Sequence, residues 1–344
     1  MDSRSADELF MQRALDLAQL SIGAVSPNPM VGCVIVHHNK IIGEGRHERY
    51  GAAHAEVNAV ASVDDPLLLS DSTVYVNLEP CSHFGKTPPC ADMLVKHRVK
   101  KVVIANIDPN PLVSGKGIEK LKAARIEVVT GILETQGREL NKRFFTFMEK
   151  KRPYLILKWA ETSDGFIARE NFDSKWISNE HSRKLVHKWR SEEDAVLVGT
   201  GTALHDNPAL TVRDWAGRNP VRIVIDRFGK LPQTLALFDG SQQTICYTAH
   251  RDESAKNLEV VKLPETDFIT AMLNDLFKRN VQSVIIEGGA TTLSQFLKER
   301  LWDEARIFTS PEQFGSGIAA PKFTGNLMSR ESVFTDTLAI YRNP

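Results

Sequence analysis

The feature that most constrains the fold is an alternation of strand and helix patterns, interrupted once by the charged stretch Glu149-Lys-Lys-Arg-Pro153. Before it, strands are expected at 31–37, 40–45, 72–78, 102–106 and 126–130, and helices at 5–20, 54–62, 89–97, 117–124 and 133–148. After it, strands are expected at 154–160, 195–199, 221–226, 244–248, 283–286 and 305–309, and helices at 179–190, 266–279 and 291–298. Such alternation predicts sheets covered by helices. We therefore expect two α/β domains, residues 1–150 and 151–344.

The first helix is predicted from its start signal and its apolar spacing. Ser5-Ala-Asp-Glu8 has the form of a capping box. Phe10, Ala14, Leu17 and Leu20 follow at helical intervals. We expect an amphipathic helix that begins at Ser5.

Charge and composition favour a small substrate in the cytoplasm. Lys plus Arg and Asp plus Glu each number 43, and no Lys/Arg-rich run of the kind that binds polynucleotides occurs. No segment has the apolar length of a membrane span, and the charged N-terminus does not resemble a secretory signal. The chain has 4 cysteines, too few and too scattered for a disulfide framework. We expect no nucleic-acid partner, no membrane association and a cytoplasmic location.

Three candidate metal ligands precede or begin predicted helices in the first half. They are His54 in His54-Ala-Glu56, Cys81 in Glu79-Pro-Cys81, and Cys90 in Pro88-Pro-Cys90. A helix N-terminus lowers the pKa of a thiol and favours the thiolate that zinc binds. Three ligands leave a fourth position for water, as in catalytic zinc sites, and thiolates with imidazole favour Zn²⁺. Glu56 is then predicted to move protons, as in zinc deaminases.

The spacing of the cysteines leaves alternatives open. Cys81 and Cys90 are farther apart than in the Pro-Cys-x-x-Cys signature of that class, so Cys90 could instead be a buried core cysteine. A structural zinc is disfavoured because only three ligands are found. A nucleic-acid base deaminase would share His-x-Glu and Pro-Cys, but it would need an electropositive channel.

Three segments of the first half resemble one enzyme family. They are Ser26-Pro-Asn-Pro-Met-Val-Gly-Cys33, His54-Ala-Glu56 and Leu78-Glu-Pro-Cys-Ser-His-Phe-Gly-Lys-Thr-Pro-Pro-Cys90. They resemble the deaminase half of the bifunctional pyrimidine deaminase/reductase of riboflavin biosynthesis, in which the longer cysteine spacing is the normal one. The resemblance implies a cytidine-deaminase-like three-layer fold. It also implies a pyrimidine pocket lined by Asn28, His47, His83, Lys86, Asp108 and Asn110.

Simpler roles exist for some of these pocket residues. Asn28 precedes a proline and Asp108-Pro-Asn-Pro111 has turn chemistry, while His47 could lie on the surface. Lys86 is the natural partner for a substrate phosphate.

The second half lacks the Gly-x-Gly-x-x-Gly pattern of dinucleotide-binding folds. Ser283-Val-Ile-Ile-Glu-Gly-Gly289 predicts a strand that ends in paired glycines before a helix. Such a junction can bind a phosphate through backbone N–H groups, although most bind nothing. From the residues alone, this half gives only a hint of nucleotide binding.

Motifs in the second half resemble the reductase half of the same family, in the same order. They include Leu157-Lys-Trp-Ala160, Asp164-Gly165, Ser174-Lys-Trp-Ile177, Asp206-Asn-Pro208, Leu210-Thr-Val-Arg213 and Glu287-Gly-Gly289. The resemblance implies a dihydrofolate-reductase-like fold. It assigns NADPH to Ala160, Trp176, Thr202, Asp206 and Gly289. It assigns the substrate to Ser174, Arg190, Leu210, Arg213 and Glu287.

Two points in this half remain open. Arginines suit an anionic sugar phosphate, but Arg190 and Arg213 could equally form surface ion pairs of small energetic value. Glu161 stands near the expected nicotinamide site, where family members usually have a small residue, and a buried unpaired carboxylate would be costly. No side-chain acid for the reduction is evident, and no motif is found after Glu312.

The expected function is a pair of consecutive riboflavin-pathway steps on a pyrimidine ribosyl phosphate. Hydrolytic deamination would use Zn²⁺, and reduction of the ribosyl group to ribityl would use NADPH. The alternative is a deaminase whose C-terminal domain is a non-catalytic binding or oligomerisation module. A homo-oligomer, dimer or tetramer, is expected.

Overall fold

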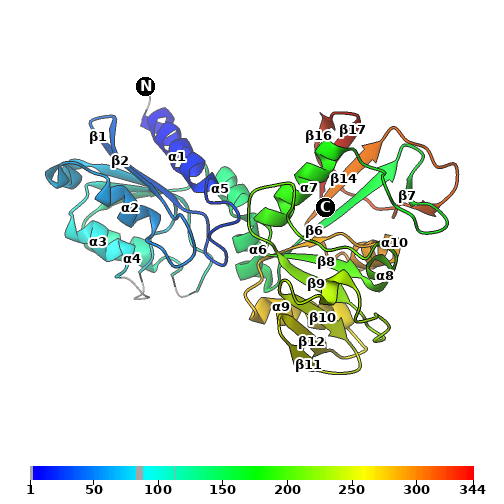
Figure 1. The fold of residues 1–344 in the computed structure, drawn as a ribbon. Coiled ribbons are helices and arrows are strands. Elements are labelled where there is room, and N and C mark those ends of the chain that lie inside the picture. The colour runs from blue at the N-terminus through cyan, green and yellow to red at the C-terminus, as the bar shows by residue number, and fades with distance from the viewer. Residues whose placement is uncertain (1–2, 83–87, 112) are drawn as a thin grey trace. The chain divides into compact units, whose positions relative to one another are not determined.

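The chain forms two compact units, residues 1–150 and 151–344 (Figure 1). The computed structural model describes residues 3–82, 88–111 and 113–344. Among these, no helix combines the length and the apolar character that a membrane crossing requires.

The first unit is built on a five-stranded sheet in the order β2-β1-β3-β4-β5. β1 runs antiparallel to β2 and β3, whereas β3, β4 and β5 are parallel. Its strands are β1 (Gly32–His37), β2 (Lys40–Arg46), β3 (Thr73–Leu78), β4 (Lys101–Asn106) and β5 (Glu127–Thr130). Its helices are α1 (Ser3–Gln19), α2 (Ala55–Ala61), α3 (Cys90–Lys96), α4 (Lys116–Ala123), α5 (Glu134–Leu140) and α6 (Lys142–Lys150), with the 3-10 turn η1 (Pro66–Asp71).

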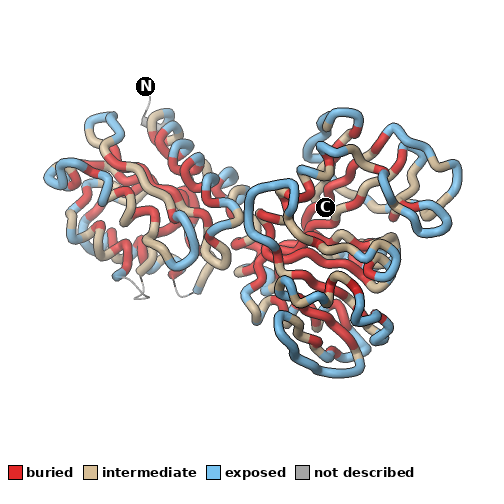
Figure 2. The backbone as a smooth tube through the Cα atoms, in the orientation of Figure 1, coloured by how far each residue is buried: buried red, intermediate tan, exposed pale blue. Residues whose placement is uncertain are grey.

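Side-chain alternation along β1 divides the core of this unit into two layers. Cys33 and Ile35 pack with residues of α2, α3 and α4. Val34 and Val36 point to the other face and pack with α1. The sheet is therefore covered on both faces, and buried backbone follows its strands (Figure 2). This is the expected three-layer arrangement.

Two helix predictions in this unit were wrong in detail. α1 already includes Ser3, so Ser5 lies inside the helix and is not its N-cap. Leu20 lies beyond the helix and is 65% exposed. The single helix expected over 133–148 is divided at Asn141, whose side chain accepts from Met30 N (2.8 Å) and donates to Met30 O (2.9 Å). Asn141 is buried, and its side chain binds the backbone of Met30, which lies 111 positions earlier in the sequence.

The second unit contains a ten-stranded sheet in the order β11-β12-β10-β9-β8-β13-β6-β14-β17-β16. The strands from β12 to β14 in this order are parallel, and the two edges are antiparallel. The parallel strands are β6 (Tyr154–Thr162), β8 (Ala195–Gly199), β9 (Val221–Ile225), β10 (Thr244–Thr248), β12 (Leu258–Lys262), β13 (Ser283–Ile286) and β14 (Glu304–Ser310). The edge strands are β11 (Glu253–Ala255), β16 (Asn326–Val333) and β17 (Asp336–Arg342), and β7 (Phe166–Ala168) pairs separately with β15 (Ile318–Ala319).

Helices cover both faces of this sheet as well. Its helices are α7 (Glu180–Glu192), α8 (Thr200–Asp206), α9 (Phe268–Lys278) and α10 (Ala290–Lys298), with the 3-10 turn η2 (Ala236–Phe238). Apolar residues of α9 and α10 pack on one face, and those of α7 and α8 pack on the other. The sequence did not predict α8, β7, β11, β12 or the strands after Glu312.

Candidate active sites

The three predicted metal ligands converge at the ends of α2 and α3. His54 occupies the N-cap position of α2, Cys90 is the first residue of α3, and Cys81 follows β3. His54 Nδ1 lies 3.6 Å from Cys81 Sγ and 3.3 Å from Cys90 Sγ. All three candidate ligand atoms lie within 4.8 Å of one another. Cys90 is buried, but its sulfur faces the other two ligands, so it is not only a core cysteine.

The two thiols of this cluster share a proton, and Glu56 lies beside them as a candidate proton carrier. Hydrogen bonds from Cys90 and His54 lower the pKa of Cys81 to about 4, which favours a thiolate there, whereas the hydrogen bond to Cys81 and burial raise the pKa of Cys90. Burial, with the neighbouring charge of Cys81, raises the pKa of Glu56 to about 7. One imidazole and two sulfur donors are a ligand set that zinc prefers, and three protein ligands are typical of catalytic sites. A carboxyl group with a pKa near neutrality can both accept and donate a proton.

Asn28 and His47 extend this site on one side. The ring of His47 lies 5.6 Å from that of His54, centroid to centroid, and is buried, so a surface position for His47 is excluded. Its Nδ1 is 3.0 Å from the carbonyl oxygen of Ala53, so Nδ1–H donates there. Nε2 is then free to accept from Asn28 Nδ2 at 3.1 Å. Both residues therefore belong to one hydrogen-bonded arrangement beside His54.

Glu79, which sequence analysis did not single out as a site residue, joins the segment of Cys81 to α4 and to the loop of Asp108. Its Oε1 accepts from the N–H groups of Gly117 (2.9 Å) and Ile118 (3.2 Å). Its Oε2 accepts from the N–H groups of Gly115 (2.9 Å) and Asp108 (3.3 Å). Three of these groups belong to the N-terminal turn of α4, where a carboxylate is favourable. The Glu-Pro-Cys motif therefore anchors Cys81 to α4 and to the loop of Asp108.

Asp108 and Asn110 follow the carboxyl end of β4. Asp108 is buried, and its Oδ1 accepts from the N–H of Asn110 at 2.8 Å, so the turn chemistry expected for this segment is present. Burial is the main cause that raises the pKa of Asp108 to about 6. The other two predicted pocket residues, His83 and Lys86, lie outside the described residues.

Three of the five residues assigned to NADPH lie at the carboxyl ends of adjacent parallel strands. Ala160 lies in β6, Thr202 follows β8 and Gly289 follows β13, and these strands are neighbours in the order β8-β13-β6. A Cβ atom on Gly289 would lie 3.2 Å from Thr202 Oγ1, so the N-terminal turns of α8 and α10 approach closely. Asp206 ends α8 and accepts from Ser174 Oγ at 3.3 Å. Trp176 is 68% exposed on the loop after β7.

The two charged residues assigned to the substrate bind each other. Arg190 donates from Nε to Glu287 Oε1 (2.7 Å) and from Nη2 to Oε2 (2.9 Å). Their side chains are 11% and 10% exposed, so this is a buried pair and not the surface pair considered from the sequence. Burial alone would raise the pKa of Glu287, but Arg190 and Lys158 lower it to about 2. Lys158 was not predicted as a site residue, and burial lowers its pKa.

Leu210 and Arg213 lie on the loop after α8. Leu210 is buried and has a φ of 51°, in the left-handed region. The Arg213 guanidinium donates to Thr211 Oγ1 at 3.3 Å. Within the part of the chain that the structure describes, no carboxylate binds Arg213. The surface ion pair considered for Arg213 is thus not found there.

Glu161 is hydrogen-bonded within the second unit. Its Oε2 accepts from the indole N–H of Trp159 at 2.8 Å, and its Oε1 accepts from Thr309 Oγ1 at 3.5 Å. Trp159 is buried and requires a partner for this N–H. The carboxylate is therefore satisfied, which removes the cost expected for an unpaired charge.

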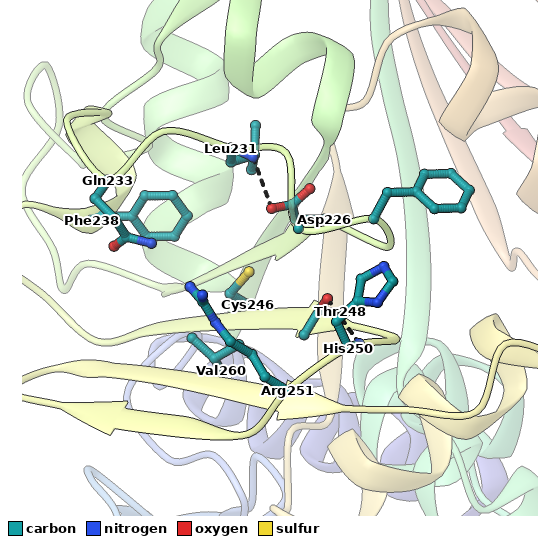
Figure 3. Close-up of a pocket in the computed structure, with 11 residues that line it drawn as sticks. Asp226, Leu231, Gln233, Phe238, Cys246, Thr248, His250, Arg251 and Val260 are labelled. Carbon is teal, nitrogen blue, oxygen red and sulfur yellow. Dashed lines mark hydrogen bonds between the residues drawn. The ribbon is translucent and has the colours of Figure 1, made fainter.

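A cavity of about 190 Å³ lies at the carboxyl ends of β9 and β10 in the large sheet (Figure 3). Asp226 directly follows β9 and Thr248 ends β10, and both line it with His250 and Arg251. Asp226 accepts from the N–H of Leu231 at 3.0 Å. Ligands of open α/β sheets bind outside the carboxyl ends of the strands. None of the predicted site residues lines this cavity.

Comparison with known proteins decides the family. A family model described as "RibD C-terminal domain" matches residues 153–338, and one described as "Cytidine and deoxycytidylate deaminase zinc-binding region" matches residues 4–106. The riboflavin biosynthesis protein RibD of Aquifex aeolicus is 41% identical over 322 residues, covering 92% of this chain and 90% of that protein. This chain belongs to the RibD family. The RibD of Bacillus amyloliquefaciens is 41% identical over 329 residues, covering 93% of this chain and 88% of that protein.

A solved RibD-family structure has the same fold over the whole chain. It is the diaminohydroxyphosphoribosylaminopyrimidine deaminase/5-amino-6-(5-phosphoribosylamino)uracil reductase of Thermotoga maritima, with a TM-score of 0.91 and 38% identity, covering 99% of each chain. The chain is accordingly a riboflavin biosynthesis enzyme that combines a zinc-binding deaminase and a reductase. The predicted enzyme class and α/β fold class are confirmed.

The zinc-binding region of the deaminase family model covers the whole His-Cys-Cys cluster, because residues 4–106 include His54, Cys81 and Cys90. Two functional candidates were missed in the sequence, although both lie within motifs quoted there. Lys158 is in Leu157-Lys-Trp-Ala160 and Glu79 is in Glu79-Pro-Cys81. The signal was a charged residue within or directly after a strongly apolar strand, since such a charge needs a specific partner.

Proposed function

We propose that this chain performs two consecutive steps of riboflavin synthesis. The first is hydrolytic deamination of 2,5-diamino-6-ribosylamino-4(3H)-pyrimidinone 5′-phosphate. The second is NADPH-dependent reduction of the ribosyl group to ribityl. The observation that supports this best is the cluster of His54, Cys81 and Cys90 beside a buried Glu56, on a chain whose other unit matches the RibD C-terminal domain.

In the deamination, His54, Cys81 and Cys90 would hold the zinc ion. When bound, zinc lowers the pKa of a water molecule so that it can act as a nucleophile at neutral pH. The Glu56 carboxylate would take a proton from that water and return it to the departing amino nitrogen, and its raised pKa of about 7 suits both transfers. The products are the uracil derivative and ammonia.

The remaining deaminase residues would orient the pyrimidine. Asn28 already uses its Nδ2 on His47, so its Oδ1 is the atom that we assign to a donor on the substrate ring. We assign the ribosyl phosphate side to Asp108 and Asn110 together with His83 and Lys86, four further residues that the family resemblance implies. Lys86 supplies the positive charge that a phosphate needs.

In the reduction, NADPH would lie along Ala160, Trp176, Thr202, Asp206 and Gly289. When bound, NADPH supplies the hydride to C1′. The close N-terminal turns of α8 and α10 present backbone N–H groups, which favour the phosphates of a dinucleotide.

The substrate of the reduction would contact Ser174, Leu210, Arg213 and the pair of Arg190 with Glu287. Because Arg190 is committed to Glu287, we assign the substrate phosphate to Arg213, whose guanidinium binds no carboxylate within the described residues. Lys158 adds a buried N–H donor that faces Glu287. The satisfied Glu161 weakens the alternative in which this unit has lost reduction.

Location and assembly are part of the same proposal. All four cysteines are free in the structure, which supports a reducing cytoplasm. We propose a dimer or tetramer, which light scattering would test.

The test is incubation of the purified, zinc-loaded protein with the diaminopyrimidine ribosyl phosphate. Ammonia release is followed without NADPH, and NADPH oxidation is followed after its addition. We expect ammonia in the first phase and oxidation in the second. Ammonia without oxidation would refute the reductase assignment, and neither signal would refute the whole proposal.

A further inference from the structure

Three consecutive residues of the loop assigned to the reductase substrate, 211–213, are held by side chains of two α7 residues and of Asn219, which lies farther along the same loop. Arg190 Nη1 donates to the carbonyl oxygen of Thr211 at 3.1 Å. The N–H of Val212 donates to Asn219 Oδ1 at 2.7 Å. The N–H of Arg213 donates to His187 Nδ1 at 3.2 Å. The loop thus has a fixed backbone path although it belongs to no helix or strand.

His187 is a buried residue of α7, one turn before Arg190. Residues three apart lie on one face of a helix, so both side chains reach the same loop. His187 Nε2 lies 3.3 Å from Asp214 Oδ2. Since Nδ1 accepts a hydrogen bond, the hydrogen of a neutral ring is on Nε2, where Asp214 can accept it.

Charged groups from three segments of the chain act on His187. Arg190 lies on its own helix, Arg213 and Asp214 lie on the loop, and Glu287 follows β13. Burial is the largest influence and lowers the pKa of His187. The two arginines lower this pKa further, whereas the two carboxylates raise it. At neutral pH the ring is therefore uncharged, as acceptance by Nδ1 requires.

We propose that His187 is a positioning residue of the reductase site, whose neutral imidazole fixes the backbone of Arg213 and so places the Leu210–Arg213 loop for the substrate. This rests on the proposed reduction. Protonation would convert Nδ1 into a donor, which would then face the N–H donor of Arg213. Acid should therefore weaken substrate binding before it affects hydride transfer.

Two substitutions separate the two ring nitrogens. H187N places an amide oxygen near the position of Nδ1 and retains an acceptor for Arg213 without a titrating group. H187Q reaches the position of Nε2, so it retains contact with Asp214 and loses the acceptor for Arg213. D214N is the matched control, because it changes the exposed partner of Nε2 and leaves the Nδ1 acceptor in place.

Steady-state NADPH oxidation with the deaminated uracil substrate gives the readout, at about pH 7.5 and about pH 5.5, on either side of the ordinary histidine pKa. At the higher pH we expect H187Q to raise KM about tenfold, which corresponds to the loss of one partly buried hydrogen bond. H187N and D214N should stay within about twofold of the wild type. On acidification, KM should rise more for the wild type than for H187N, with kcat changing little in both. Ionisation of the substrate phosphate affects the wild type and H187N equally, so it cancels in the ratio of their KM values.

Equal KM values for H187N and H187Q, or the same acid dependence in the wild type and H187N, would overturn the proposal. Loss of kcat in every protein, wild type included, would instead refute the proposed reduction. Histidine-nitrogen NMR of the isotope-labelled, full-length wild type gives an answer that does not depend on activity. We expect His187 to carry its hydrogen on Nε2, and a hydrogen on Nδ1 at neutral pH would also overturn the proposal.

Discussion

Replacement of Glu79 by glutamine tests how the deaminase site is assembled. Each carboxylate oxygen of Glu79 accepts two backbone N–H groups, at 2.9 and 3.2 Å for Oε1 and at 2.9 and 3.3 Å for Oε2. A glutamine of the same shape keeps one oxygen acceptor. Its NH₂ group must face two N–H donors, so two bonds to a charged acceptor are lost.

The cost follows from the number of bonds lost. Hydrogen bonds to charged groups contribute about 1.5–3 kcal/mol each, so E79Q should lower the free energy of unfolding of the first unit by about 3–6 kcal/mol. Domains are commonly stable by only about 5–15 kcal/mol. Because the same change loosens the loops of Cys81 and Asp108, we also expect less zinc retention and slower deamination.

Urea unfolding can assign this loss to one unit. All 5 tryptophans lie after residue 150, so their fluorescence follows the second unit, whereas circular dichroism follows both. We expect E79Q to add an early transition in circular dichroism and to leave the fluorescence transition in place. The control is E119Q, which changes an exposed residue in the first turn of α4 and should cost about 0.3–1 kcal/mol. A loss for E79Q no larger than that of E119Q would refute the reasoning.

Two further predictions concern one residue in each unit. E56Q removes the proposed proton carrier and should slow ammonia release by about 10²–10⁴-fold while NADPH oxidation with the deaminated substrate is unchanged; ammonia release at the wild-type rate would contradict that role. E287Q leaves Arg190 buried without its partner and should cost about 3–5 kcal/mol of unfolding free energy at neutral pH. Since the pKa of Glu287 is lowered to about 2, below the ordinary value of about 4.3, its contribution is complete above about pH 5 and is lost as the pH falls toward 2. The difference between wild type and E287Q in urea midpoint, followed by tryptophan fluorescence, should therefore shrink with acid, and a constant difference would contradict the assignment.

Much of the fold could be predicted because its central strands and covering helices have strong local patterns. β3, β4, β8 and β13 are largely apolar runs between turn signals, as buried parallel strands should be. β16 could not be found in this way, because almost all of its residues are exposed and no alternation marks its faces. The break at Asn141 also has a distant cause, since its side chain binds the backbone of Met30.

The sequence alone predicted His54, Cys81 and Cys90 as zinc ligands and Glu56 as a proton carrier, and the structure brings the three ligand atoms together. His54 and Glu56 lie at the start of α2, Cys90 begins α3 and Cys81 follows β3, so short local motifs were enough to predict the ligand types. Only the tertiary structure decided which charges pair. Arg190 meets Glu287 across 97 positions of sequence, and Glu79 meets the start of α4 across 38. These partners follow from how strands and helices pack, because a hydrogen bond depends on distance in space and leaves no trace in local spacing.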